Sequence, residues 1–147
     1  MLDMPKAPQT ILGFDFGTKK IGIAVGQSVT QTVTPLVTLT SQNQKPDWPG
    51  IENIINEWQP NLLVVGLPVH LDGEEQAMTQ AAKKFGNRLN GRFQLPVEFM
   101  DERLSSYEAE QRLKEINLMK KTTNKRQTAL DIDKIAAQLI VESWFRQ

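Results

Sequence analysis

The order of apolar and polar residues predicts three consecutive strands at the start of the chain. Alternating apolar positions predict strands over about residues 10–16 and 20–26, joined by a tight turn. A third run, residues 32–39, is rich in β-branched residues and also indicates a strand. Because Pro35 has no N–H group to donate, we expect this strand to lie at a sheet edge or to begin after the proline.

The rest of the chain alternates between helix and strand. Short apolar runs predict strands over residues 62–65 and 95–100. Apolar stripes at helical spacing predict four helices. The first starts at Asp47–Pro49 and stops at Pro60, and the second starts at Asp72 and ends near Asn90–Gly91. The third runs from Ser105 to about Ile116, and the fourth from about Ala129 to Phe145. This order predicts an α/β fold, in which helices flank a mixed sheet.

Length and composition indicate an ordinary globular chain. It has 147 residues, of which 39% are hydrophobic and 23% are charged. We expect a loose N-terminal arm over residues 1–9 and a single domain over residues 10–147. The absence of a secretory signal and of an apolar run of about 20 residues predicts a cytoplasmic protein without a membrane partner.

The charged and metal-binding residue types exclude several functions. The chain has 17 basic and 17 acidic residues, so any contact with a polyanion must come from a local basic patch. It has no cysteine, which excludes disulfides, thiolate metal sites and a cysteine nucleophile. His70 is the single histidine, which excludes a multi-histidine zinc site. Nothing in the pattern assigns a role to His70 itself.

Asp15 is an unusual residue for its position, because it lies near the end of an apolar strand. Alternation places it on the same strand face as Ile11 and Gly13. An unpaired charge there is costly, so a cation, a metal ion or solvent at the edge of the sheet should compensate for it. The alternative is that Asp15 only closes the turn through Gly17 and Thr18.

The last predicted helix carries a second acid with an unusual position. Asp133 precedes Ala137, Ile140 and Trp144 at helical spacing, which places it at the head of the buried stripe and directs it toward the sheet. Asp131 lies instead on a mostly polar face of the same helix. The alternative for Asp133 is that it only complements the dipole at the N-terminus of the helix.

Glu102 can complete a cluster with these two acids. Ligands of open sheets gather outside the carboxyl ends of parallel strands, where Asp15 and Glu102 both lie. Three acids together would repel one another unless a divalent cation intervened, and oxygen ligands favour Mg²⁺ or Mn²⁺. Two such ions about 4 Å apart would activate a water and stabilise the leaving oxygen of a phosphodiester. Asp101 is an alternative to Glu102, and the spacing does not choose between them.

Four motifs in order resemble the YqgF family, also called RuvX, of the ribonuclease-H-like superfamily. The matching segments are Asp15–Gly22, Val65–Pro68 with Asp72–Gly73, Asp101–Ser105, and Asp133–Ala137. The resemblance covers the chain from about Thr10 to the C-terminus. It departs from many members at Lys19 or Lys20, where they have arginine, and at Gly26-Gln27, where they have Ser-Asp.

The resemblance implies a ribonuclease-H-like fold, with a mixed five-stranded sheet whose first three strands are antiparallel. It implies a nuclease that uses one or two Mg²⁺ or Mn²⁺ ions and matures the 5′ end of 16S ribosomal RNA; the older family assignment is cleavage of branched DNA. It places the catalytic and metal-binding acids at Asp15, Glu102 and Asp133. The expected phosphate contacts are Thr18, Lys19, Arg103, Lys125 and Arg126.

Two other functional classes remain as alternatives. The Asp-x-Gly-Thr turn also occurs in actin-like and Hsp70-like ATPases, but a second nucleotide-closing domain does not fit in 147 residues. A non-catalytic RNA-binding factor of ribosome assembly is the other alternative. The expected partners are precursor rRNA, branched DNA or a pre-ribosomal particle. The choice of RNA or DNA, and of monomer or homodimer, stays open.

Overall fold

A five-stranded mixed sheet forms the centre of the protein. The computed structural model describes residues 7–67, 73–101 and 125–147, with the side chains of all of these except 73–76 and 125–131. The strands are β1 (Thr10–Phe16), β2 (Lys20–Gln27), β3 (Thr32–Thr40), β4 (Leu62–Leu67) and β5 (Val97–Asp101). Their spatial order is β3-β2-β1-β4-β5. β1 pairs antiparallel with β2 and parallel with β4, so the predicted antiparallel start and mixed sheet are confirmed.

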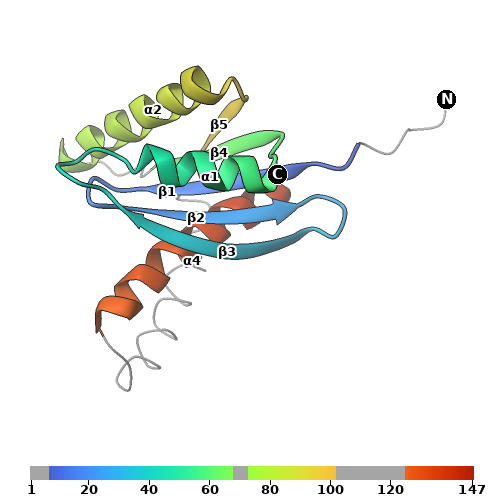
Figure 1. The fold of residues 1–147 in the computed structure, drawn as a ribbon, viewed down its shortest axis with the longest axis horizontal. Helices are drawn as coiled ribbons and strands as arrows, with labels where there is room; N and C mark the ends of the chain where they lie inside the picture. Colours follow the sequence, from blue (N-terminus) through green and yellow to red (C-terminus); the bar gives the residue numbers. More distant parts are fainter. Residues whose placement is uncertain (1–6, 68–72, 102–124) are drawn as a thin grey trace.

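Helices cover both faces of this sheet (Figure 1). The helices α1 (Trp48–Trp58) and α2 (Gly73–Phe93) lie on one face, and α4 (Lys125–Phe145) crosses the other. The sheet is therefore the middle of three layers, with a separate apolar core on each side. None of the helices in the described part of the chain is long and apolar enough to cross a membrane.

The two cores divide the side chains of β1 as strand alternation predicts. Leu12 and Phe14 are fully buried in the core beneath α1 and α2. Ile11 is fully buried in the other core, beneath Ile140 and Val141 of α4. The faces of β1 are thus fixed by packing on both sides, and the side on which Asp15 lies follows from them.

Most of the predicted elements are confirmed, including the edge position of the third strand. β3 forms one edge of the sheet, and Pro35 lies in it opposite Ala24, next to an irregularity in the register. A proline is tolerated there because an edge strand has unpaired N–H positions. Asp47 is the N-cap of α1, where its carboxylate accepts a hydrogen bond from the Gly50 N–H at 3.0 Å.

Four predicted boundaries were wrong by a few residues. β4 ends at Leu67 and not at residue 65. α2 continues past Asn90–Gly91 to Phe93, because the left-handed residue that ends it is Gln94, with a φ of 55°. β5 begins at Val97 and not at residue 95, since Pro96 has no N–H group for the ladder. α4 begins at Lys125 and not at residue 129, because polar residues with long side chains also form helices readily. The helix predicted from residue 105 lies outside the described residues.

Candidate functional site

Asp15 lies at the carboxyl end of β1, on the face of the sheet that α4 covers. Ile11 and Gly13 share this face, because Ile11 packs into the α4 core and a Cβ on Gly13 would overlap Val141 of α4. Asp15 follows Gly13 by two strand positions and is half-buried. Its partner across the antiparallel ladder is Gly22 of β2.

Asp133 lies on α4, at the point where this helix packs against the strand beside Asp15. A Cβ on Gly22 would overlap the backbone carbonyl of Asp133, so the helix backbone rests directly on β2 at this glycine. Opposed residues of an antiparallel pair have Cα atoms about 5 Å apart. The glycine therefore brings the helix turn that carries Asp133 next to the strand end that carries Asp15.

A lysine from the start of β2 pairs with this second acid. Lys20 Nζ lies 3.4 Å from Asp133 Oδ2, and the two side chains are 35% and 22% exposed. The same Oδ2 atom is buried and accepts no hydrogen bond from the described residues. This carboxylate oxygen therefore has an ion-pair partner in Lys20 but receives no hydrogen bond from the described residues.

Sequence reasoning missed Lys20 as a residue of this site. The signal was present in strand alternation, because Lys20 and Gly22 are two residues apart and therefore share a face. What the sequence did not show is that α4 crosses β2 at this position.

Asp101 does not lie on the face of the sheet that α4 covers. Val97 and Phe99 of β5 face α2, since both lie close to Gly86 of that helix. Asp101 follows them at two-residue spacing, whereas Met100 packs into the core beneath α4. Asp15 and Asp101 thus lie on opposite faces. Glu102, the other candidate for the third acid, lies outside the described residues.

The predicted phosphate contacts divide between the described and the remaining parts of the chain. Thr18 and Lys19 are exposed in the turn between β1 and β2, directly after Asp15. The Lys19 carbonyl accepts a hydrogen bond from the Ser41 N–H at 2.8 Å, which ties the turn to the end of β3. Lys125 and Arg126 begin α4, although their side chains are not described. Arg103 and His70 lie outside the described residues, as does the side chain of Asp131.

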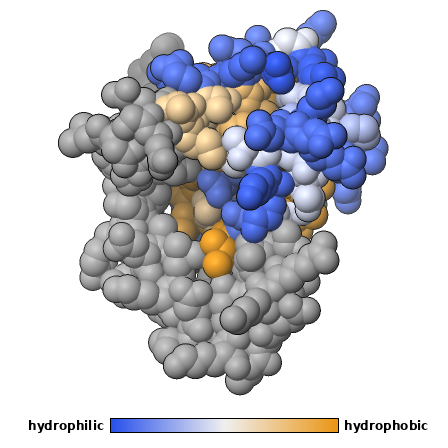
Figure 2. Space-filling model, turned by 90° about the vertical axis from the view of Figure 1, so that its left-hand side faces the viewer, coloured by the Kyte–Doolittle hydropathy of each residue, from blue (hydrophilic) through white to orange (hydrophobic). Residues whose placement is uncertain are grey.

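The described residues at the end of the molecule that carries this turn are mostly hydrophilic. Figure 2 looks onto it and shows strongly polar residues over most of the described surface, beside a smaller apolar area. A polar rim of this kind suits a charged ligand better than an apolar one.

The oxygen atoms of these carboxylates are suitable ligands for a hard divalent cation. Carboxylate oxygens are the preferred ligands of Mg²⁺ and Mn²⁺, and Asp133 Oδ2 is a buried oxygen without a hydrogen-bond donor. In the described part of the chain no three acids or histidines gather into one metal-binding group. Asp15 and Asp133 together supply two carboxylates, and a third donor is required to complete such a site.

Solved structures show the same fold. RuvC of T. thermophilus in complex with a Holliday junction substrate superposes with a TM-score of 0.59, at 12% identity, over 92% of this chain and 93% of that chain. A second structure of Thermus thermophilus RuvC gives a TM-score of 0.50 with the same coverage. The predicted ribonuclease-H-like α/β fold is thereby confirmed.

Relatives that are much more similar in sequence cover nearly the whole chain. A protein of Haemophilus ducreyi is 54% identical over 136 residues, which are 92% of this chain and 95% of the relative. One from Shewanella denitrificans is 50% identical over 137 residues, which are 93% of this chain and 94% of the relative. Each carries the name "Putative pre-16S rRNA nuclease".

A family model agrees with these relatives. The model described as "RuvX: Holliday junction resolvase" matches residues 9–147. The predicted resemblance is confirmed, and the chain, as a hydrolase of the nuclease class, belongs to the RuvX family.

Proposed function

We propose that this protein is a metal-dependent nuclease that hydrolyses phosphodiester bonds of precursor 16S rRNA, at the 5′ end, in the cytoplasm. Residues 10–147 would form one nuclease domain. The observation that carries the proposal is that the segments bearing Asp15 and Asp133 lie next to each other on one face of the sheet, at Gly22, with a buried Asp133 oxygen that receives no hydrogen bond. Relatives of about 50% identity that carry the name "Putative pre-16S rRNA nuclease" support the choice of substrate.

Three acids have the central role in this proposal. Asp15, Glu102 and Asp133 would hold one or two Mg²⁺ or Mn²⁺ ions. A bound ion would activate a water molecule and neutralise the charge that develops on the phosphate. Asp15 lies in β1, paired with Gly22 across the ladder, and α4 packs against β2 at this glycine through the backbone of Asp133. Both acids are thus positioned by packed elements and not by loops, as a reactive geometry requires.

The turn after Asp15 would contact the substrate backbone. Thr18 can donate its hydroxyl to a phosphate oxygen, and Lys19 can pair with the phosphate charge, since both are exposed. Lysine binds phosphate as a point charge and lacks the bidentate geometry of arginine. Arg103, Lys125 and Arg126 are proposed as further contacts. These contacts position the strand without reading its sequence.

A second candidate function is cleavage of branched DNA. The matching family model is described as a Holliday junction resolvase, and a RuvC of similar fold is seen with a junction substrate. Resolution of a junction requires two cuts, so it would require a homodimer. Cleavage of RNA without any cleavage of a four-way junction would exclude this candidate.

The decisive experiment compares the wild-type protein with Asp15→Asn on precursor 16S rRNA and on a four-way DNA junction, with Mg²⁺ or Mn²⁺ added. We expect the wild type to cleave the RNA, and the variant to bind it with unchanged affinity without cutting it. Removal of one metal-binding carboxylate should lower the cleavage rate by at least about a hundredfold. If the wild type binds RNA but never cleaves with either metal, the protein is a non-catalytic assembly factor and the proposal fails.

A further inference from the structure

A second polar feature of the surface lies on the α1/α2 side of the sheet, and none of the acids of the candidate site lines it. It is a groove of about 580 Å³ between the start of α1 and the C-terminal part of α2. It is lined by Lys45, Pro46, Trp48, Arg88, Gly91 and Arg92. Three of these six residues are cations and none is acidic. We call this feature the basic groove.

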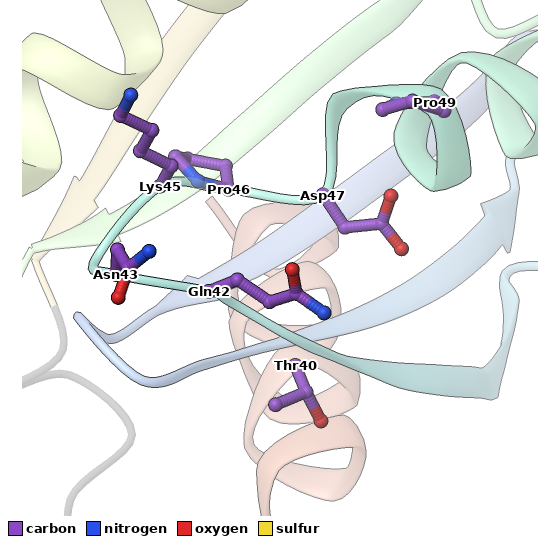
Figure 3. Close-up of a pocket in the computed structure, with 7 residues that line it drawn as sticks. All are labelled: Thr40, Gln42, Asn43, Lys45, Pro46, Asp47 and Pro49. Atoms are coloured by element: carbon purple, nitrogen blue, oxygen red, sulfur yellow. The ribbon is translucent and has the colours of Figure 1, made fainter.

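The three cations of the basic groove are not neutralised. Lys45, Arg88 and Arg92 are exposed, and among the described residues no ion pair involves any of them. The nearest acid along the chain, Asp47, caps α1 through the Gly50 N–H. In Figure 3 the Lys45 amine points away from the Asp47 carboxylate. In a chain whose formal charges cancel, this is a local concentration of positive charge.

One of the cations, Arg92, is held in place by another side chain, and the backbone that carries a second, Lys45, is fixed in a turn. The guanidinium carbon of Arg92 lies 4.1 Å from the centre of the Trp48 ring, a stacked arrangement that leaves the edge of the guanidinium open to a ligand. Lys45 ends a two-residue turn, in which its N–H donates to the Gln42 carbonyl at 2.9 Å and its carbonyl accepts from the Gln42 N–H at 3.1 Å. A cation that is already ordered loses less entropy when it binds an anion.

The basic groove lies close to the end of the sheet that carries Asp15. Phe16, the next residue, stacks on Phe85 of α2 with ring centres 4.9 Å apart. Phe85 in turn stacks on Trp48 at 5.6 Å, and Trp48 forms the floor under Arg92. One stack of aromatic rings therefore connects the strand end beside the acids to the groove. The loop that carries Lys45 also starts at this end, where Ser41 is bonded to Lys19.

We propose that the basic groove binds the phosphate backbone of the nucleic-acid strand as it runs from the acidic edge across the β3–α1 loop. This inference rests on the proposed function for the choice of a nucleic acid as the ligand. Several cations that line one groove suit a chain of phosphates, which offers successive negative charges. The groove would supply affinity and direction without selecting a sequence.

The test measures how salt weakens binding. Lys45→Gln and Arg88→Gln are combined in the Asp15→Asn background, so that no substrate is cut during the measurement. Arg92 is kept, because its contact with Trp48 stabilises the fold. The affinity for a single-stranded precursor-16S RNA fragment and for a four-way DNA junction is then measured across a range of KCl concentrations. The slope of log affinity against log salt is negative, and we expect its magnitude to decrease by about 1 to 2 in the variant. We expect the affinity itself to fall about tenfold.

The matched control is the double variant Lys83→Gln with Lys84→Gln in the same background. Both lysines are exposed on α2, outside the basic groove, and the net charge changes by the same amount. We expect their slope to stay at that of the parent. Equal slopes for the groove variant and the parent, or equal losses in both double variants, would overturn the inference. The proposed function is judged separately, by whether the wild type cleaves and Asp15→Asn does not.

Discussion

Lys20 Nζ lies 3.4 Å from Asp133 Oδ2, so the chain supplies its own cation at a carboxylate that is proposed to hold metal. An ammonium group and a divalent ion would compete for the same negative charge. The pair is partly exposed, and solvent screening limits its strength to about 1 kcal/mol. A metal ion that binds Asp133 must therefore displace only a moderate ion pair with Lys20.

We predict that Lys20→Gln binds Mn²⁺ about fivefold more tightly than the wild type, because the competing ammonium is gone. The metal-free variant should be about 1 kcal/mol less stable, since Asp133 then lacks a charged neighbour. Calorimetric titration with Mn²⁺ and thermal unfolding in EDTA measure the two effects.

Lys19→Gln is the control for this experiment, because Lys19 is the adjacent lysine and is exposed in the turn. We expect its Mn²⁺ affinity to remain within about twofold of the wild type, since exposed charges are screened. Weaker Mn²⁺ binding in Lys20→Gln would show that Lys20 positions Asp133 for the metal and does not compete with it.

Asp101→Asn should cleave nearly as fast as the wild type, in contrast to Asp15→Asn. Asp101 follows Val97 and Phe99 on the strand face that packs toward α2, away from the face of Asp15. We expect a rate within about threefold of the wild type, because Asp101 lies on the opposite face of the sheet from Asp15 and the substitution keeps the size of the side chain. Steady-state cleavage of precursor rRNA measures it. A loss as large as that of Asp15→Asn would place Asp101, and not Glu102, among the required acids.

Gly22→Ala tests whether the contact between α4 and β2 positions the acids. A methyl group at this position would overlap the backbone carbonyl of Asp133, and backbone cannot rotate away as a side chain can. We predict a loss of about 3 kcal/mol of unfolding free energy, together with a loss of cleavage. Urea unfolding measures the first effect.

Gly91→Ala is the opposite case and serves as the control. Gly91 is exposed near the end of α2, and a Cβ there would meet no atom within 4 Å. We expect a gain of about 0.5–1 kcal/mol, because alanine favours a helix more than glycine does. Equal stability of the wild type and Gly22→Ala would mean that helix and sheet can separate there at no cost.

The sequence predicted those features that depend on neighbours along the chain. Strand alternation assigned Leu12 and Ile11 to opposite faces. Pro35 indicated a strand that lies at an edge or begins after the proline, and the structure has the first of these. Helical spacing placed Asp133 at the head of a buried stripe, which continues through the buried Ala137. These are local rules of geometry, and tertiary packing agrees with them.

Features that join distant segments were not predictable. The pairing of Lys20 with Asp133 depends on where α4 crosses β2. The basic groove exists because Trp48 and Phe85 bring the start of α1 next to α2. Neither the crossing of α4 over β2 nor the packing of α1 beside α2 can be predicted from one stretch of sequence. The end of α2 was also misjudged, because Gln94 adopts the left-handed conformation that glycine usually supplies.

Gln59→Gly should stabilise the protein, because Gln59 ends α1 in a conformation that costs less for glycine. Its φ is 50° and its ψ is 57°, and its N–H donates to the Ile55 carbonyl at 2.8 Å. A side chain with a Cβ costs about 1–2 kcal/mol in the left-handed region. Part of this gain is offset by the greater freedom of glycine in the unfolded chain.

The net expectation for Gln59→Gly is a gain of about 0.5–1 kcal/mol, or about 2–3 °C in the midpoint of thermal unfolding. Gln59→Ala separates backbone strain from the side chain. Both variants lose the exposed hydrogen bond that Gln59 Nε2 donates to the Asn56 carbonyl at 3.0 Å, but alanine keeps the Cβ. Alanine should therefore give no gain. If both variants unfold at the same temperature, the left-handed cap stores no strain, and the end of α1 is fixed by Pro60 alone.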